Sequence, residues 1–154
     1  MKPERIPPLH VVTDDAVIAR PDFVERAGAV LEAGGPELVF HLRAPTAPGR
    51  RVFDLARALV PLAIDAESWL VVNDRVDVAL AAADGAHVGA RGPAPGDARR
   101  LLGPGRLLGV SVHSADEARE ALEGEPDFLF AGSIWATPSH SERAPAGTGL
   151  IGES

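Results

Sequence analysis

Cysteine and tyrosine are absent from this 154-residue chain, and Lys2 is its single lysine. Without cysteine there is no disulfide, no thiolate nucleophile and no zinc–thiolate site. Because Lys2 lies at the very terminus, neither a Schiff-base lysine nor a lysine general base is expected. Proton transfer must therefore rely on His, Asp or Glu.

Long apolar runs are also missing, so no segment is expected to span a bilayer, and the first residues do not resemble a signal peptide. We therefore expect a cytoplasmic location and no membrane partner. The net charge of −7 argues against nucleic acid as a partner. With 45% hydrophobic residues and no break in composition, the chain is predicted to form one domain over residues 1–154.

Short apolar runs that end in polar residues recur along the chain and alternate with helix-like segments. The predicted strands are residues 9–13, 38–43, 69–73, 85–88, 107–113 and 128–131. Such a series is typical of β/α units, in which the chemistry gathers at the carboxyl ends of parallel strands. The spacing alone fits either an open doubly wound sheet or a β/α barrel.

Amphipathic periodicity and end signals place helices between these strands. Asp22 is predicted to cap a helix that stops at Gly34, and Ser114 to cap residues 115–122 with Glu117 completing a capping box. Further helices are predicted at 52–64, 76–82 and 97–102, and residues 133–149 are expected to form a loop. No Gly-x-Gly-x-x-Gly motif follows the first strand, so a dinucleotide-binding fold gains no support.

Several motifs in series resemble the thiamine-phosphate synthase/TenI family over nearly the whole chain. They are Asn73-Asp74-Arg75, residues 84–89 (Asp-Gly-Ala-His-Val-Gly), residues 109–114 (Gly-Val-Ser-Val-His-Ser) and residues 130–140. The resemblance implies an α/β fold of the (β/α)₈ TIM-barrel type, of which about six units are present. It also implies a small phosphorylated thiazole as a substrate.

Two activities occur in the family. The synthase couples an aminopyrimidine diphosphate to a thiazole phosphate and releases diphosphate with Mg²⁺, whereas the TenI branch includes a thiazole tautomerase that works by proton transfer without a metal. In the synthase pattern a lysine lies two residues after Arg43, and a second aspartate joins Asp74 at the Mg²⁺. Here those positions are Pro45 and Gly92, and Arg91 lies beside the second one. One carboxylate with an adjacent guanidinium makes a poor Mg²⁺ site.

The tautomerase is therefore the expected function, with no cofactor. The synthase is the alternative, with Mg²⁺ at Asp74, and a non-catalytic thiazole-phosphate binder is a third hypothesis. His113 matches the histidine proposed for proton transfer, and an imidazole with a pKa of about 6.5 both takes and gives a proton near neutrality. The resemblance assigns substrate or phosphate binding to Arg43, Asn73, Asp74, Ser111, Thr137, Ser139 and His140.

His41 and His87 are predicted to be packing residues. No metal site is expected, because the sequence spacing of the five histidines shows no short ligand motif. Family members continue through two more β/α units, which carry the thiazole-phosphate turns. We therefore expect open edges at the first and sixth strands and weak or no turnover. Truncation, a second copy of the chain covering the edges, and an open sheet are the three alternatives.

Overall fold

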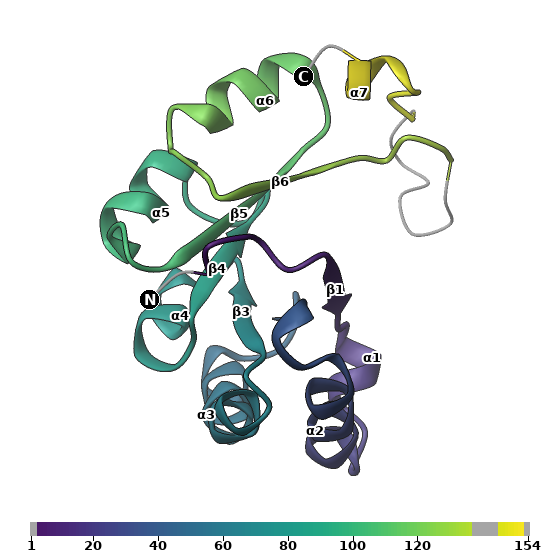
Figure 1. The fold of residues 1–154 in the computed structure, drawn as a ribbon. Coiled ribbons are helices and arrows are strands. Elements are labelled where there is room, and N and C mark those ends of the chain that lie inside the picture. Colours follow the sequence, from purple (N-terminus) through teal and green to yellow (C-terminus); the bar gives the residue numbers. More distant parts are fainter. Residues whose placement is uncertain (1–2, 137–144, 153–154) are drawn as a thin grey trace.

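The computed structural model describes residues 3–136 and 145–152, and its centre is one curved sheet of six parallel strands in the order β1-β2-β3-β4-β5-β6 (Figure 1). The strands are β1 Leu9–Val12, β2 Leu38–Leu42, β3 Trp69–Asn73, β4 Gly85–Val88, β5 Leu107–Val112 and β6 Phe128–Ala131. Each strand pairs with its successor in sequence, which requires a crossover between every two neighbours.

Helices form most of these crossovers and lie along the outer, convex side of the sheet (Figure 1). They are α1 Asp15–Ile18, α2 Phe23–Gly34, the 3₁₀ turn η1 Gly35–Glu37, α3 Gly49–Asp65, α4 Val76–Ala82, α5 Pro95–Leu102 and α6 Ala115–Leu122. The short helix α7 Gly149–Gly152 follows β6 and forms no crossover. A doubly wound sheet would carry helices on both faces and reverse its strand order at a switch point. The consecutive order and the curvature confirm the expected barrel-type fold and exclude that alternative.

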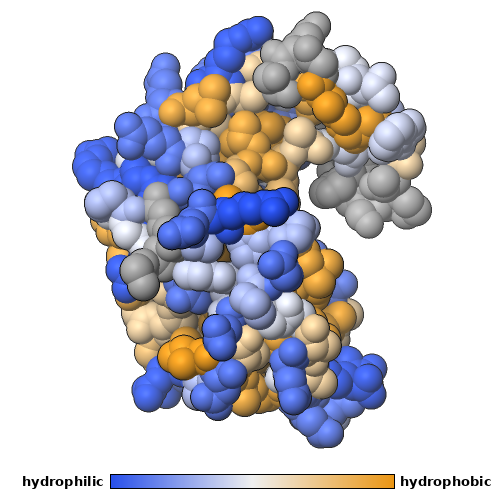
Figure 2. Space-filling model, viewed as in Figure 1, coloured by the Kyte–Doolittle hydropathy of each residue, from blue (hydrophilic) through white to orange (hydrophobic). Residues whose placement is uncertain are grey.

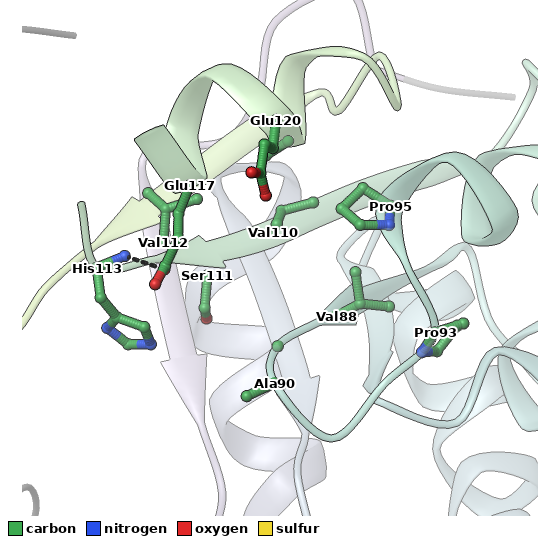
Figure 3. Close-up of a pocket in the computed structure, with 12 residues that line it drawn as sticks. Val88, Ala90, Pro93, Pro95, Val110, Ser111, Val112, His113, Glu117 and Glu120 are labelled. Carbon is green, nitrogen blue, oxygen red and sulfur yellow. Dashed lines mark hydrogen bonds between the residues drawn. The ribbon is translucent and has the colours of Figure 1, made fainter. Parts of the chain in front are cut away.

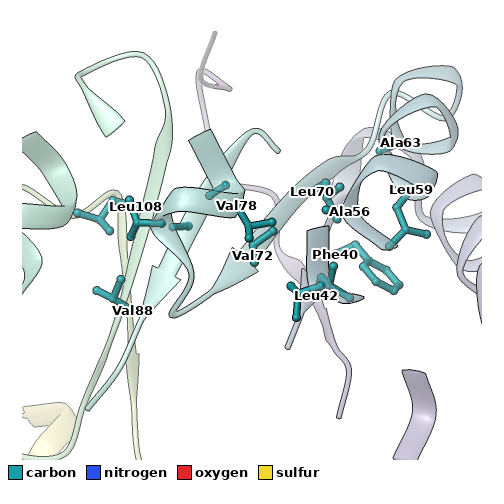
Figure 4. Close-up of a cluster of buried hydrophobic side chains, with 14 of the residues drawn as sticks. Phe40, Leu42, Ala56, Leu59, Ala63, Leu70, Val72, Val78, Val88 and Leu108 are labelled. Atoms are coloured by element: carbon teal, nitrogen blue, oxygen red, sulfur yellow. The ribbon is translucent and has the colours of Figure 1, made fainter. Parts of the chain in front are cut away.

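The main core lies between the sheet and its helices. Phe40 and Leu42 of β2, with Leu70 and Val72 of β3, alternate along their strands and pack against the helices, as seen in Figure 4. Leu59 of α3 is fully buried in the same cluster. Period-two alternation therefore assigns the intervening strand residues to the inner, concave face.

The inner face is filled by side chains in layers. Val39, Val71 and Leu107 form a fully buried floor at the amino ends of the strands, where Ile6 and Trp69 pack against it. Above this floor lies a ring cluster whose members come from β1, β2, β4 and β6, namely His10, His41, His87, Phe128 and Phe130. The floor and the cluster leave the carboxyl ends of the strands as the open end of the interior.

The two outermost strands are more exposed than the central ones. All five residues of β2 are buried, whereas Leu9 and Val12 of β1 are 49% and 47% exposed. Hydrophobic side chains also gather near the other edge, over the upper part of the molecule in the space-filling view (Figure 2). Even so, the ring of His10 lies 5.0 Å from Phe128 and 5.1 Å from Phe130, so residues of β1 and β6 meet across the interior.

Capping follows the sequence prediction for one helix and departs from it for another. At α6 the Ser114 hydroxyl accepts from the Glu117 N–H at 3.1 Å, while the Glu117 carboxylate accepts from the backbone of His113, one residue before the cap. Asp22 precedes α2 but does not cap it, because its carboxylate binds Arg20 and Arg26 instead. Among the described residues, no helix is long and apolar enough to cross a membrane.

Candidate anion-binding site at the strand ends

A cavity of about 500 Å³ lies at the carboxyl ends of the strands. Its lining comes from the ends of β1 to β5 and the loops that follow them. The lining residues are Val12, Arg43, Asn73, Asp74, His87, Gly89, Ala90, Arg91, Ser111 and His113. A polar cavity therefore opens directly above the apolar and aromatic filling of the barrel interior.

Thr13 fixes the backbone of Arg43 beside this cavity. The buried Thr13 hydroxyl accepts from the Arg43 N–H at 2.9 Å and donates to the Arg43 carbonyl at 2.9 Å. Both polar groups of the Arg43 backbone are thus satisfied by one side chain of the neighbouring strand. Because its backbone is held in this way, Arg43 extends its guanidinium from a fixed position at the end of β2.

Asp74 lies in the turn between β3 and α4, and hydrogen bonds tie it to the end of β4. Its φ of 61° is left-handed, which Asp tolerates better than most residues. Its N–H donates to the His87 carbonyl at 2.8 Å, and its Oδ1 accepts from the Gly89 N–H at 2.9 Å. One oxygen of this carboxylate is therefore already committed to the protein.

Guanidinium groups dominate the charge around the cavity. Arg43 and Arg91 both line it, and they also line an adjoining cavity of about 230 Å³ together with Arg75. Arg75 is paired with the exposed Asp77 at 2.6 Å. Among the described residues, Asp74 is the only carboxylate in either lining, so a protein with a net charge of −7 has a locally cationic pocket. A pocket of this charge favours an anionic ligand, and a guanidinium fork suits phosphate oxygens.

His113 lies at the rim of the cavity, between β5 and α6. Its Nδ1 bonds to the carbonyl of Gly132, which accepts only, so Nδ1 carries the proton and Nε2 has the free lone pair in the neutral ring. Glu117 binds the backbone N–H of His113 at 2.7 Å. Figure 3 shows this bond beside a third cavity, of about 210 Å³, and the side chains of His113 and Ser111 both point away from α6.

Ser111 is connected to the buried ring cluster. Its Oγ lies 2.7 Å from Nε2 of His87, a residue that is 2% exposed. Burial, followed by nearby His10 and Arg43, lowers the pKa of His87 to about 4. Burial likewise lowers the pKa of His41 to about 3, so both rings are neutral at physiological pH.

The structure brings five of the eight residues named from the sequence into one cavity: Arg43, Asn73, Asp74, Ser111 and His113. The other three, Thr137, Ser139 and His140, lie outside the described residues. Sequence reasoning missed His87, Arg91 and Thr13 as part of this site. His87 was expected only to pack, although its inward position follows from the strand alternation.

The donor set does not fit a Mg²⁺ ion held by two protein carboxylates. No group of three or more His, Asp or Glu side chains able to hold a metal occurs in the described part of the chain. At Gly92 an added Cβ would lie 3.2 Å from Asp74 Oδ1, so this position faces the carboxylate but contributes no side chain to it. Asp74 is left with one uncommitted oxygen and cationic neighbours, whereas Mg²⁺ sites rely on oxygen ligands and negative charge.

Fold and cavity together define a class of protein: a parallel β/α barrel-type domain with a cationic pocket at the carboxyl ends of its strands. Comparison with a solved structure agrees with this fold. The chain superposes on a thiamine phosphate pyrophosphorylase from Pyrococcus furiosus with a TM-score of 0.75 and 30% identity, over 93% of this chain and 66% of the other.

Sequence comparisons identify the family. The family model described as thiamine monophosphate synthase matches residues 9–153. A thiamine-phosphate synthase of Solidesulfovibrio magneticus is 49% identical over 98% of this chain and 72% of its own length, and that of Moorella thermoacetica is 43% identical over 86% and 62%. The chain therefore belongs to the thiamine monophosphate synthase family. It spans 58% to 72% of the lengths of the first four curated relatives that it matches.

Proposed function

We propose that this chain forms the diphosphate-binding side of a thiamine-phosphate synthase active site. The observation that carries the proposal is the cationic cavity at the strand ends, in which Arg43 and Arg91 face a single carboxylate. The names of the relatives support the same activity, so the alternative raised by the sequence is favoured over the tautomerase. The ligands are an aminopyrimidine diphosphate and a thiazole phosphate.

The reaction makes a specific demand on such a cavity. The bond between the pyrimidine methylene carbon and the diphosphate oxygen breaks, the diphosphate keeps the electron pair, and the lone pair of the thiazole nitrogen forms the new carbon–nitrogen bond. Negative charge grows on the departing oxygen, so groups that stabilise it must already be in place. The guanidinium of Arg43, whose backbone is held by Thr13, meets that requirement.

Arg91 is the second group proposed to stabilise the leaving diphosphate. It lines both adjoining cavities, and no hydrogen bond or ion pair of its guanidinium is seen within residues 3–136 and 145–152. The two guanidiniums, one after β2 and one after β4, would neutralise part of the diphosphate charge. In the synthase pattern the lysine and the metal held by a second carboxylate do this. No step of this proposal passes through a metal ion.

Thiazole tautomerase activity is a second candidate because of His113. The Gly132 carbonyl holds the proton on Nδ1 and leaves Nε2 as a base at the rim of the cavity. A base in this position could remove a proton from a bound thiazole phosphate and return it elsewhere on the ring.

Two assays on the same purified chain separate these functions. Diphosphate release is measured from aminopyrimidine diphosphate plus thiazole phosphate, with Mg²⁺ and again with EDTA, and aromatisation of the carboxythiazole phosphate is followed separately by its absorbance. We expect weak but measurable diphosphate release, in keeping with the low turnover expected from the sequence, and Arg43→Gln should reduce it at least tenfold. Arg50→Gln is the matched control, because Arg50 is 84% exposed and pairs with Asp54.

Each of the other assay results would indicate a different function for the chain. Aromatisation without diphosphate release, abolished in His113→Asn, would establish the tautomerase in place of the synthase. Binding of thiazole phosphate with neither activity would indicate a non-catalytic binder. Absence of both binding and turnover would overturn the proposed site as a whole.

A further inference from the structure

His87 connects the buried ring cluster to the anion pocket through one hydrogen bond. Its Nε2 lies 2.7 Å from the hydroxyl of Ser111, and both residues line the cavity. The ring is packed on its other sides by His41 and Phe130, with centroids at 5.4 and 4.7 Å. This bond therefore determines how the Ser111 hydroxyl is oriented.

The packing of Nδ1 decides which nitrogen of His87 carries the proton. Nδ1 is buried and has no hydrogen-bond partner in the described part of the chain. It lies against the backbone of Gly109, where an added Cβ would be only 2.5 Å away. A proton on Nδ1 would bury an N–H against carbon, and buried N–H groups without acceptors are rarer than acceptors without donors. The proton therefore resides on Nε2, which donates to Ser111.

The surroundings of His87 keep the ring neutral. Burial opposes protonation most, followed by His10 of β1 and Arg43 just after β2. The third titratable or cationic group that faces the ring is His41 of β2, which is itself neutral and buried. Asn73, Ser111 and the two phenylalanines of β6 supply no negative charge to stabilise an imidazolium. The ring thus has one proton, on Nε2, over the physiological pH range.

We propose that His87 is a positioning residue that makes the Ser111 hydroxyl a directed donor to the bound anion. Because Ser111 Oγ accepts from His87, its own proton is free to point into the cavity towards a phosphate oxygen. Without His87 the hydroxyl rotates, and its proton can satisfy other acceptors. This inference rests on the proposed diphosphate site and assigns a task to a residue that otherwise only fills the interior.

A double-mutant cycle with inorganic diphosphate tests the connection. His87→Asn ends its amide one atom short of the ε position, whereas His87→Gln places an amide N–H there. We expect His87→Asn and Ser111→Ala each to weaken diphosphate binding about five- to tenfold, and His87→Gln to stay within about twofold of the wild type. In the Ser111→Ala background, His87→Asn should cause no further loss, because the effect passes through Ser111.

Wild-type binding by His87→Asn, or losses that multiply in the double variant, would overturn the proposal. A second measurement needs no ligand and is made on the wild-type chain: the ¹⁵N chemical shifts of the imidazoles. We expect His87 to show a protonated Nε2 and an unprotonated Nδ1 from pH 8 to pH 5, with its signals assigned by their loss in His87→Gln. A proton on Nδ1, or an imidazolium at pH 6, refutes the positioning role.

The two proposals fail in different ways. If the wild type binds no diphosphate, the proposed synthase site is wrong. Ser111 then has no bound anion as a hydrogen-bond acceptor, whichever nitrogen of His87 carries the proton. If the wild type binds diphosphate but the cycle shows independent effects, the site stands and His87 is only a packing residue.

Discussion

Acid should destabilise this protein well above the pH at which carboxylates titrate, because two buried histidines must stay neutral in the fold. The pKa values of His41 and His87 fall from 6.5 to about 3 and about 4, mainly through burial. Above pH 6.5 both folded and unfolded chains hold these rings neutral, so the fold has its full stability. Below pH 6.5 the unfolded chain takes up protons that the folded chain refuses, and stability falls until the folded values are reached.

The magnitude follows from the size of the pKa shifts. At pH 5, which is 1.5 units below the unfolded value of 6.5, each histidine removes about 2 kcal/mol, and the two together about 4 kcal/mol. The lowered pKa of the partly buried His10 adds to this in the same direction. A domain of this size has a stability of roughly 5–15 kcal/mol, so the loss is a large share of it.

Urea denaturation at pH 8, 6.5 and 5, followed by tryptophan fluorescence, measures this loss. His41→Gln should remove about half of the pH dependence, whereas the control Asp22→Asn should leave it unchanged, because the pKa of Asp22 is about 2 and its titration lies below this range. A free energy of unfolding at pH 5 within about 1 kcal/mol of the value at pH 8 would show that the rings are protonated without cost and refute the reasoning.

Three further predictions concern single side chains. Gly109→Ala should destabilise the fold by about 2–3 kcal/mol, because its Cβ would lie 2.3 Å from Phe128, whereas Gly105→Ala has nothing within 4 Å and should change little in the same urea assay. Arg99→Ala should lower the free energy of unfolding by about 2–3 kcal/mol, because Asp127 and three backbone carbonyls lose the guanidinium that binds them. The control Arg100→Ala, whose side chain is 77% exposed, should lower it by under about 0.5 kcal/mol. Equal losses in the two variants would contradict this. Asp74→Asn should bind inorganic diphosphate in EDTA at least as tightly as the wild type by calorimetry, since it removes the one carboxylate among the described lining residues, and weaker binding would contradict the view that this carboxylate opposes the anion.

Local signals in the sequence were enough to locate the regular elements. The apolar runs predicted all six strands, and the bounds of α4 and α6 agree with the prediction. Ser114 marks the start of α6 as its cap, whereas α4 has no side-chain cap. Helix α3 begins at Gly49, earlier than the periodicity indicated, since Pro48 and the first turn carry no apolar stripe. The short helices α1 and α7 were missed, because four residues show no periodicity.

The sequence does not predict which side chains of different strands come into contact. His10, His41 and His87 lie on three different strands, and only the register places them in one cluster. Strand alternation could have marked them as inward-facing, but not as neighbours. The carboxylate of Asp22 was assigned to a helix cap because the choice between backbone and guanidinium partners depends on side-chain geometry.

The choice between the two activities shows the same limit. In the sequence, Pro45 and Gly92 replace a lysine and an aspartate of the synthase pattern, which disfavours the synthase. Arg91 counts there only as a positive charge that opposes a metal ion. In the folded chain Arg91 lines the cavity beside Arg43, so its charge is available to an anion. Counting motif positions could not show that a neighbouring side chain serves the same pocket.

Calorimetric titration of aminopyrimidine diphosphate is the most direct test of the claim that the strand ends form one cationic pocket. We predict saturable binding to the wild type and to Arg50→Gln, and at least a tenfold loss in Arg43→Gln and in Arg91→Gln, since each removes a guanidinium from the lining. Equal affinities in all four proteins, or no binding to the wild type, would contradict the account.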